Sequence, residues 1–299
     1  MSGSRRRRGS CCTSPPRGRP TALPSCSSTG SRSWRSRGVT SWRRSPTPGY
    51  RVLAPDMRGY GQSSRPAAIE AYDNTSLRGD VLALIDWCGV ERAAVIGHDW
   101  GSSLTWHCAL AAPERLACVA GLSVPAVPRA PAAPLPIFRR HMGEGFYIVW
   151  FQDPGAAEAV LEADPRRTLA TTKVWTEAWA DSDDDPPTPP FMTEDEFQVY
   201  VDTFTETGFT GGLNYYRNID RNWEADGAYA GRTIDVPAMF LTGSRDPVQN
   251  FMPKEAMTGL VTDLRETVIV EGAGHWVQQE RPDEVNAALL SFLADVYPA

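Results

Sequence analysis

The sequence predicts an α/β fold in which a mostly parallel sheet is flanked by helices and interrupted by an inserted helical cap. Strand-like and helix-like segments alternate over residues 50–124, helical segments follow over residues 125–230, and the alternation resumes over residues 231–299. The chain has 299 residues, of which 41% are hydrophobic and 22% are charged, which suits one large core with an insertion. We therefore predict a core built from the first and third of these segments and a cap built from the second.

Buried strands are predicted at five short apolar runs in the two core segments. These runs cover residues 51–55, 93–96, 117–122, 236–242 and 267–270. Between the first two runs, Asn74 or Thr75 can cap a helix that stops at Gly89, and a closing helix is expected over residues 283–296. The core is therefore split around the cap.

The cap is predicted to be mainly helical. Five prolines between residues 125 and 136 mark an extended linker at its start. Helical patterning then covers residues 138–151, 155–161, 166–180 and 193–207. The acidic, proline-rich run 181–190 is expected to be a solvated loop.

One stretch of the core, Gly97-His98-Asp99-Trp100-Gly101, places an acid at the turn between a buried strand and a helix. Small residues two positions before and two after the tip let the backbone turn sharply and expose the tip side chain. Because the tip residue is Asp99, the predicted nucleophile is a carboxylate instead of a hydroxyl. A helix-capping aspartate is the alternative interpretation, but a cap does not need both flanking glycines.

Two further candidate residues follow predicted strands later in the chain. Asp246 follows the strand at residues 236–242, and His275 follows the strand at residues 267–270. The chain order nucleophile, acid and base, with each group at a strand end, is typical of hydrolase triads built on a parallel sheet. We therefore predict that Asp99, Asp246 and His275 meet at one edge of the sheet. A turn carboxylate and a structural histidine are the alternatives for the last two.

From residue 50 to its end the chain resembles the soluble epoxide hydrolases of the α/β-hydrolase superfamily. The resemblance rests on the Asp-tipped turn, on the later Asp and His, and on two cap segments at residues 146–155 and 212–218. It implies the α/β-hydrolase fold, a small-molecule epoxide as substrate, and neither a cofactor nor a metal. Matched residue by residue, it implies that Tyr147 and Tyr216 form the ring-opening pair; an ordinary packed aromatic is the alternative for each.

This resemblance also implies a mechanism that the residue types can perform. Asp99 attacks an epoxide carbon and forms a covalent ester. The two tyrosines donate hydrogen bonds to the ring oxygen. His275, oriented by Asp246, then activates the water that hydrolyses the ester. The oxyanion formed in that step needs two N–H donors, of which Trp100, the residue after the nucleophile, offers one.

Residues 1–49 do not fit this organisation. They contain eleven arginines, no lysine and no acidic residue, and they lack hydrophobic periodicity. Read one frame over, the codons for residues 20–49 can encode DGPAVVLVHGFPELAESWRHQLAALADAG, which contains a strand and the HG-X-P turn that supplies the second oxyanion donor. We interpret this basic arm as a frame-shifted translation of the N-terminal strands. A nucleic-acid or membrane tail and an organelle transit peptide are the alternatives.

As written, the arm is expected to be poorly ordered and to leave a strand position empty beside the strand that precedes Asp99. A catalytically impaired product without the HG-X-P turn is therefore one alternative function. A dehalogenase of the same fold is another, since it also uses an aspartate nucleophile, an acid and a histidine, although a halide leaving group needs no tyrosine donors.

Composition limits the remaining possibilities. The body of the chain after the arm is strongly acidic, which argues against nucleic acid as the main partner. No apolar run approaches the ~20 residues that span a bilayer, so a cytoplasmic protein is expected. The four histidines are dispersed and show no metal-ligand spacing. His98 is expected to be packed in the core, with a place lining the site as the alternative, and His107 is expected to be packed or at the surface. Cys88, Cys108 and Cys118 are expected to be buried free thiols, and the oligomeric state is not assigned.

Overall fold

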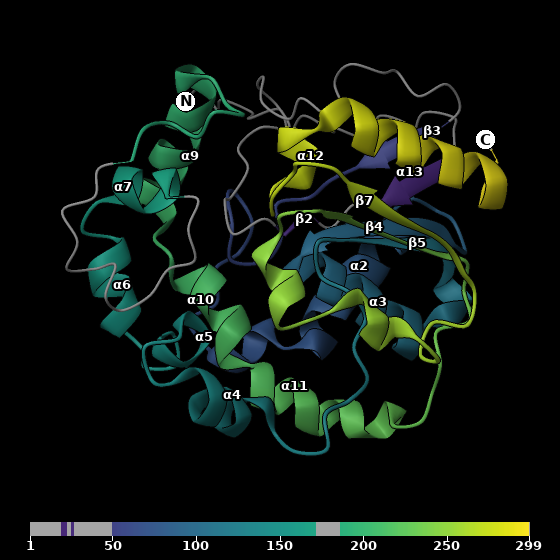
Figure 1. Cartoon of the computed structure of the whole chain (residues 1–299), viewed down its shortest axis with the longest axis horizontal. Helices are drawn as coiled ribbons and strands as arrows, with labels where there is room; N and C mark the ends of the chain where they lie inside the picture. The colour runs from purple at the N-terminus through teal and green to yellow at the C-terminus, as the bar shows by residue number, and fades with distance from the viewer. Residues whose placement is uncertain (1–18, 23–24, 27–49, 172–185, 299) are drawn as a thin grey trace, which may run out of the picture.

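The structure is a computed structural model that describes residues 19–22, 25–26, 50–171 and 186–298. Its centre is a seven-stranded sheet in the order β3-β1-β4-β5-β6-β7, with β2 also paired to β4. The strands are β1 (Arg19–Ala22), β2 (Ser25–Cys26), β3 (Tyr50–Leu53), β4 (Ala93–Asp99), β5 (Leu116–Leu122), β6 (Ala238–Gly243) and β7 (Leu264–Val270). Every pairing is parallel, so the carboxyl ends of the strands lie at one edge of the sheet (Figure 1).

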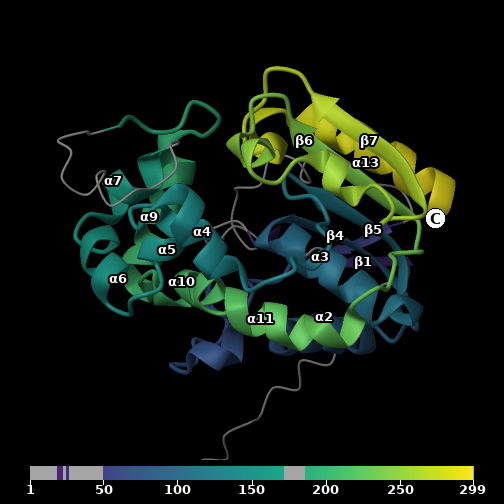
Figure 2. The ribbon, with the colours of Figure 1, turned by 60° about the horizontal axis from the view of Figure 1, so that its bottom comes forward.

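Helices cover both faces of this sheet. Figure 2 shows α2 (Asn74–Trp87) and α3 (Trp100–Ala111) on one face and α13 (Pro282–Val296) on the other. Side chains alternate between the faces along a strand. On β4, Val95 therefore joins the apolar cluster that includes α2 and α3, whereas Ala94 and Ile96 join the cluster that includes α13. The central strands are apolar on both sides for this reason.

Between β5 and β6 the chain leaves the sheet and forms a helical insertion, defined here as α4 to η3. In its described residues the helices are α4 (Pro134–Met142), α5 (Tyr147–Trp150), α6 (Ala156–Leu161), α7 (Pro165–Ala170), α9 (Glu194–Thr207), α10 (Thr210–Arg217), α11 (Ile219–Ala225) and η3 (Asp226–Tyr229). Figure 2 shows most of them gathered to one side of the sheet. Neither here nor elsewhere in the described residues does a helix combine the length and apolarity needed to cross a membrane.

The insertion begins differently from the prediction. A single helix over residues 138–151 is wrong, because the chain turns out of α4 at Gly143 with a φ of +84° and becomes helical again only at α5. The linker of five prolines is also shorter than predicted, since α4 starts at Pro134. A proline lacks an N–H that the first turn of a helix does not use, so prolines fit there.

Capping corrects the start of α2. The N-cap residue is Asp73, whose carboxylate accepts a hydrogen bond of 2.8 Å from the N–H of Ser76, instead of Asn74 or Thr75. The remaining predicted strands and helices of the two core segments are found within a few residues of their expected bounds. The short helices α10, α11 and α12 (Val277–Glu280) were not predicted.

Two short strands of the basic arm enter the sheet. β1 pairs with β3 from Arg19↔Tyr50 to Ala22↔Leu53 and with β4 through Thr21↔Ala94 and Ala22↔Val95, and β2 pairs with β4 further along. The position expected to be empty beside β4 is therefore occupied at these residues. The rest of the arm lies outside the described residues, as do residues 172–185, so the predictions made for those stretches stay predictions. A single helix over residues 166–180 is wrong, because α7 ends at Ala170 and Thr171 has an extended backbone with a ψ of 129°.

Cys88, Cys108 and Cys118 are free and buried, as predicted. Burial raises the pKa of all three thiols, to about 12 for Cys108 and for Cys118.

Core and insertion meet where two backbones touch. A Cβ atom on Gly211 of α10 would lie 2.3 Å from the carbonyl oxygen of Gly59, in the loop after β3. Beside this contact, the hydroxyl of Tyr215 donates a hydrogen bond of 2.8 Å to the carbonyl oxygen of Arg58. The absence of a side chain at Gly211 therefore sets the distance between α10 and the core.

Replacing Gly211 with alanine tests this contact. We expect Gly211→Ala to lower the free energy of unfolding by about 1–3 kcal/mol, because the new methyl group overlaps the Gly59 backbone. Gly79→Ala is the matched control, since Gly79 lies inside α2 and a Cβ atom there would have no neighbouring atom within 4 Å. There alanine should stabilise the chain by about 0.5–1 kcal/mol. Equal effects in thermal or denaturant unfolding would contradict the proposed contact.

Candidate active site

Asp99 lies at a strained turn between β4 and α3. Its φ of 53° and ψ of −118° are unusual for a residue with a side chain and store about 1–3 kcal/mol. The turn requires small neighbours, because a Cβ atom on Gly97 would lie 2.0 Å from the carbonyl oxygen of Gly101. Asp99 precedes α3 as its N-cap residue, yet its side chain accepts no hydrogen bond from that helix. The capping interpretation is therefore wrong, because the Asp99 carboxylate does not cap the helix.

The three candidate triad residues lie together at the carboxyl edge of the sheet. His275 Nε2 is 3.5 Å from Asp99 Oδ1, and His275 Nδ1 is 3.1 Å from Asp246 Oδ1 and 3.2 Å from Asp246 Oδ2. Asp246 is 4% exposed, and its Oδ1 also accepts a hydrogen bond of 3.0 Å from the N–H of Val248. One imidazole thus spans two carboxylates that come from different strand ends.

These contacts set the charge states of the triad. Burial lowers the pKa of His275, but hydrogen bonds to Asp246 and Asp99 outweigh it and raise that pKa to about 10. Burial favours the protonated form of Asp246, yet the hydrogen bond and charge of His275 leave its pKa below the usual value. At neutral pH the imidazole is therefore a cation held between the two carboxyl groups.

Tyr147 and Tyr216 come from separate helices of the insertion and meet beside the nucleophile. Their ring centroids are 5.7 Å apart, and the ring of Tyr216 meets the ring of Trp100 edge to face at 5.0 Å. Burial, followed by the negative charge of Asp99, raises the pKa of both hydroxyl groups. Both tyrosines therefore keep their protons at neutral pH and can donate hydrogen bonds close to Asp99.

Partly buried polar groups hold together the two tyrosine segments, which are residues 146–155 and 212–218. Gln152 Nε2 donates to the carbonyl oxygens of Ile148 at 2.7 Å and Tyr216 at 3.1 Å. Next to Tyr216, the Arg217 guanidinium forms two hydrogen bonds with the Glu158 carboxylate, of 2.7 and 2.8 Å. A bidentate pair fixes orientation as well as distance. The pair therefore ties α10 to α6 and keeps the tyrosine segments in register.

Two groups belong to the site although no motif singled them out. Ser123 follows β5 with a φ of 67°, and its hydroxyl donates to the carbonyl oxygen of His275 at 2.8 Å. Glu280 accepts hydrogen bonds from the N–H groups of Gly274 at 2.7 Å and Trp276 at 3.1 Å. The position of Ser123 directly after a strand was a usable signal, because loops at the carboxyl ends of parallel strands border the site in open α/β sheets.

His98 and His107 are packed, as predicted, but only His98 touches the triad. His98 Nε2 lies 2.8 Å from the carbonyl oxygen of His275. Burial lowers the pKa of His98 to about 4, so its ring is neutral and donates to that carbonyl through Nε2–H. His107 instead lies 3.1 Å from Asp226 and 3.0 Å from Arg78, between α3 and the end of the insertion.

The oxyanion donors are described in part. The N–H of Trp100 is the first of α3 and is therefore free of the helical hydrogen-bond ladder. The second predicted donor is in the HG-X-P turn that the shifted reading frame encodes. This turn corresponds to residues of the basic arm that lie outside the described ranges.

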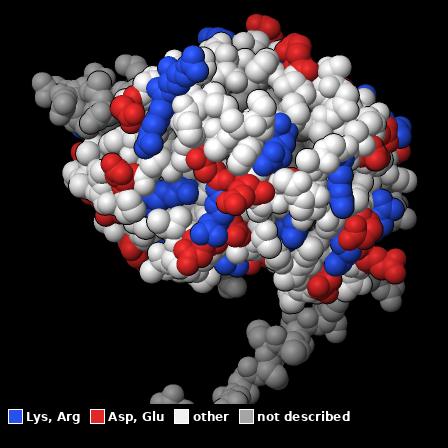
Figure 3. All heavy atoms as spheres, turned by 90° about the horizontal axis from the view of Figure 1, so that it is seen from below, with Lys and Arg blue, Asp and Glu red and all other residues white. Residues whose placement is uncertain are grey.

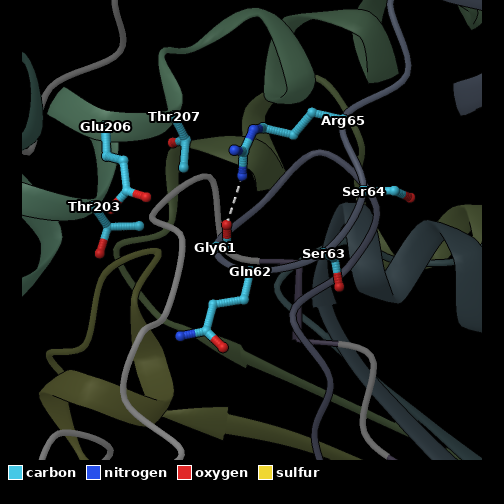
Figure 4. A pocket seen from close by; sticks show the side chains of 8 residues that line it. All are labelled: Gly61, Gln62, Ser63, Ser64, Arg65, Thr203, Glu206 and Thr207. Atoms are coloured by element: carbon cyan, nitrogen blue, oxygen red, sulfur yellow. Dashed lines mark hydrogen bonds between the residues drawn. The ribbon is translucent and has the colours of Figure 1, made fainter. Parts of the chain in front are cut away.

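A separate polar cleft of about 560 Å³ lies between the loop after β3 and α9 (Figure 4). It is lined by residues 61–65 and by Thr203, Glu206 and Thr207. In Figure 4 the Arg65 side chain turns back to donate a hydrogen bond of 2.7 Å to the Gly61 carbonyl oxygen. None of the candidate residues lines this cleft, so it is distinct from the triad. In the described part of the chain, no group of three or more His, Cys, Asp or Glu side chains could hold a metal ion.

Comparisons with known proteins place this geometry in context. Residues 23–282 match the model of the family described as the alpha/beta hydrolase fold. Epoxide hydrolase A of Mycobacterium tuberculosis is 46% identical, with 82% of each chain covered. Epoxide hydrolase 1 of Siraitia grosvenorii is 35% identical over 82% of this chain and 83% of the relative. The crystal structure of epoxide hydrolase A from Mycobacterium thermoresistibile superposes with a TM-score of 0.82 at 45% identity, covering 92% of this chain and 91% of that one.

The charge of Asp99 is expected to control the titration of His275. In Asp99→Asn the imidazole loses a neighbouring negative charge, and we expect its midpoint to fall by about 1–3 pH units from the value near 10. NMR titration of histidine-labelled protein measures this midpoint. A midpoint that does not move would show that Asp99 does not hold the proton on His275.

Proposed function

Because this chain is a hydrolase that belongs to the epoxide hydrolases of the α/β-hydrolase fold family, we propose that it opens an epoxide to a vicinal diol through an ester on Asp99. The observation that carries the proposal is the placement of two tyrosines, Tyr216 buried and Tyr147 partly buried, and one histidine around a carboxylate at a strained turn. A small-molecule epoxide is the proposed substrate.

In the first step, a carboxylate oxygen of Asp99 attacks an epoxide carbon and the ring carbon–oxygen bond breaks. The electron pair of that bond goes to the ring oxygen, which becomes an alkoxide. Tyr147 and Tyr216 are the proposed hydrogen-bond donors to this oxygen, and one of them supplies its proton. Because burial keeps both hydroxyls protonated, they are ready to donate before the ring opens.

In the second step, His275 takes a proton from water, and the water oxygen attacks the ester carbonyl carbon of Asp99. The N–H of Trp100 is the proposed donor to the oxyanion that forms. Collapse of this intermediate breaks the bond between the carbonyl carbon and the oxygen attached to the substrate. The remaining proton of the attacking water goes to that oxygen, so the diol leaves and Asp99 is again a carboxylate. His275 keeps the proton taken from water and is again a cation, as in the free chain, so the sum is epoxide plus water to diol.

The charge on Asp99 links the two steps. In the free chain, His275 carries a proton because Asp246 and Asp99 stabilise its cation. Esterification removes the charge of Asp99 and with it part of that stabilisation, so the imidazolium gives its proton to the tyrosinate left by the first step. The neutral imidazole that acts as the base of the second step therefore becomes available after the first step is complete.

The same arrangement favours an epoxide over a haloalkane. A halide leaves as a stable anion and needs no proton, whereas a ring oxygen needs a donor as it becomes an alkoxide. The hydroxyl groups of Tyr147 and Tyr216 keep their protons because their pKa is raised, so they can be this donor beside the nucleophile. We therefore propose the hydrolysis of epoxides in preference to a dehalogenase activity.

We propose that residues 125–230 act as a cap that brings both tyrosines over the core formed by residues 50–124 and 231–299. A small-molecule partner also suits the surface. Figure 3 shows acidic and basic side chains interspersed on one face of the molecule, without the broad basic patch that nucleic-acid binding uses.

For the basic arm, we propose that residues 20–49 are a frame-shifted translation of a strand and its HG-X-P turn. The shifted frame places the strand at the codons for residues 23–28, which overlap β2, a strand of two residues beside β4. Dropping one G from a run of G bases at the codons for Pro48 and Gly49 would rejoin the frames. Sequencing the gene there tests the proposal, which fails if no such run exists.

Isotope labelling tests the ester on Asp99. In a single turnover of styrene oxide by excess enzyme in oxygen-18 water, we expect the label to enter the Asp99 carboxylate, because water attacks the carbonyl carbon of the ester. Mass spectrometry of the peptide that contains Asp99 measures this. Label found in the diol alone would mean that water attacks the epoxide directly.

Two controls accompany the labelling. Asp99→Ala removes the nucleophile and should yield no diol above the uncatalysed rate. A chloroalkane offered to the unaltered chain should release no chloride; release of chloride without diol formation from styrene oxide would favour the dehalogenase.

A further inference from the structure

The loop that carries His275 has little regular structure to hold it. It joins β7 to the four-residue helix α12, and it packs directly on the end of β6. A Cβ atom on Gly243 would lie 2.3 Å from the carbonyl oxygens of both Ala273 and Gly274. The backbone on either side of His275 therefore needs other partners to stay in place.

Glu280 supplies partners on both sides of the histidine. Its Oε2 accepts from the N–H of Gly274 at 2.7 Å, and its Oε1 accepts from the N–H of Trp276 at 3.1 Å. Hydrogen bonds to a carboxylate are stronger than those between neutral groups. Gly274 lets the carboxylate come this close, since a Cβ atom there would lie 3.1 Å from Glu280 Oε1. One side chain thus bridges the residues before and after His275.

The carbonyl group of His275 is held from the opposite direction. It accepts hydrogen bonds of 2.8 Å from the Ser123 hydroxyl and from Nε2 of His98. These donors come from the ends of β5 and β4, whereas Glu280 comes from the end of α12. The peptide groups around His275 are therefore fixed by two sets of side chains.

We propose that Glu280 is a positioning residue for His275 in the second step of the reaction. This inference rests on the function proposed above. In the described residues, the Glu280 carboxylate forms hydrogen bonds with the backbone of the loop that carries His275 and with no other group. It contacts neither Asp99 nor the two tyrosines in this part of the chain. Its loss should displace the imidazole that activates water while leaving the attack of Asp99 on the epoxide in place.

The test separates the two steps in the full-length chain. Glu280→Gln keeps the size of the side chain but replaces one acceptor with an N–H₂ group that faces a backbone N–H. We expect hydrolysis of the Asp99 ester to slow about 10- to 100-fold, since displacements near 1 Å have effects of this size. Formation of the ester should change less than about 3-fold. Rapid mixing with styrene oxide, followed by quenching and mass spectrometry, measures both rates.

Rates are expressed per site that forms the ester, so a fraction of unfolded protein does not enter them. Glu284→Gln is the matched control, because Glu284 is an exposed carboxylate in the first turn of α13, and its rates should equal those of the unaltered chain. Accumulation of the ester in Glu280→Gln, but not in Glu284→Gln or in the unaltered chain, would support the positioning role. Equal slowing of both steps, or no change in either, would overturn it while the proposed function stands. An unaltered chain that forms no ester would overturn both.

Discussion

The approach of two backbone segments around Asp99 constrains the whole candidate site. Gly97 and Gly101 lie so close that neither the strand nor the helix can shift without losing the turn, and this fixes the direction of the carboxylate. Parallel pairing then brings the ends of β5, β6 and β7 beside it in order. A one-residue slip between these strands would move the surrounding polar groups to the wrong face of the sheet. The chemistry therefore depends on sheet register before it depends on any single side chain.

The insertion contributes through a different kind of contact. Its two tyrosine segments are locked to one another by partly buried polar groups, and α10 rests on the core through glycine backbones. A further bond joins the insertion to the histidine loop, since Gln279 of α12 donates to the Tyr200 hydroxyl on α9 at 3.3 Å. Helix α12 therefore touches both the insertion, through Gln279, and the backbone on either side of His275, through Glu280.

Sequence patterns predicted the triad because Asp99, Asp246 and His275 each follow an apolar strand closely, and parallel strands end at a common edge. The tyrosine pair required a family resemblance, since an aromatic residue on a cap helix has no local signature. Ser123 and Glu280 escaped prediction for a physical reason: their partners are backbone groups whose distances only folding sets. The break between α4 and α5 was missed because apolar periodicity continues across it, and the glycine that interrupts the helix acts through its backbone.

The buried thiols bear on how such a protein survives its own substrate. Epoxides are alkylating agents, and a thiolate is a far better nucleophile toward them than a carboxylate. Burial raises the pKa of Cys108 and Cys118 to about 12, so both are thiols at pH 7, and both are shielded from solvent. Burial thus keeps these sulfur atoms from reacting with an epoxide. In the proposed mechanism the carboxylate at the strained turn reacts and is regenerated, whereas the sulfur atoms, which would form thioethers that water does not cleave, are protected from modification by their burial.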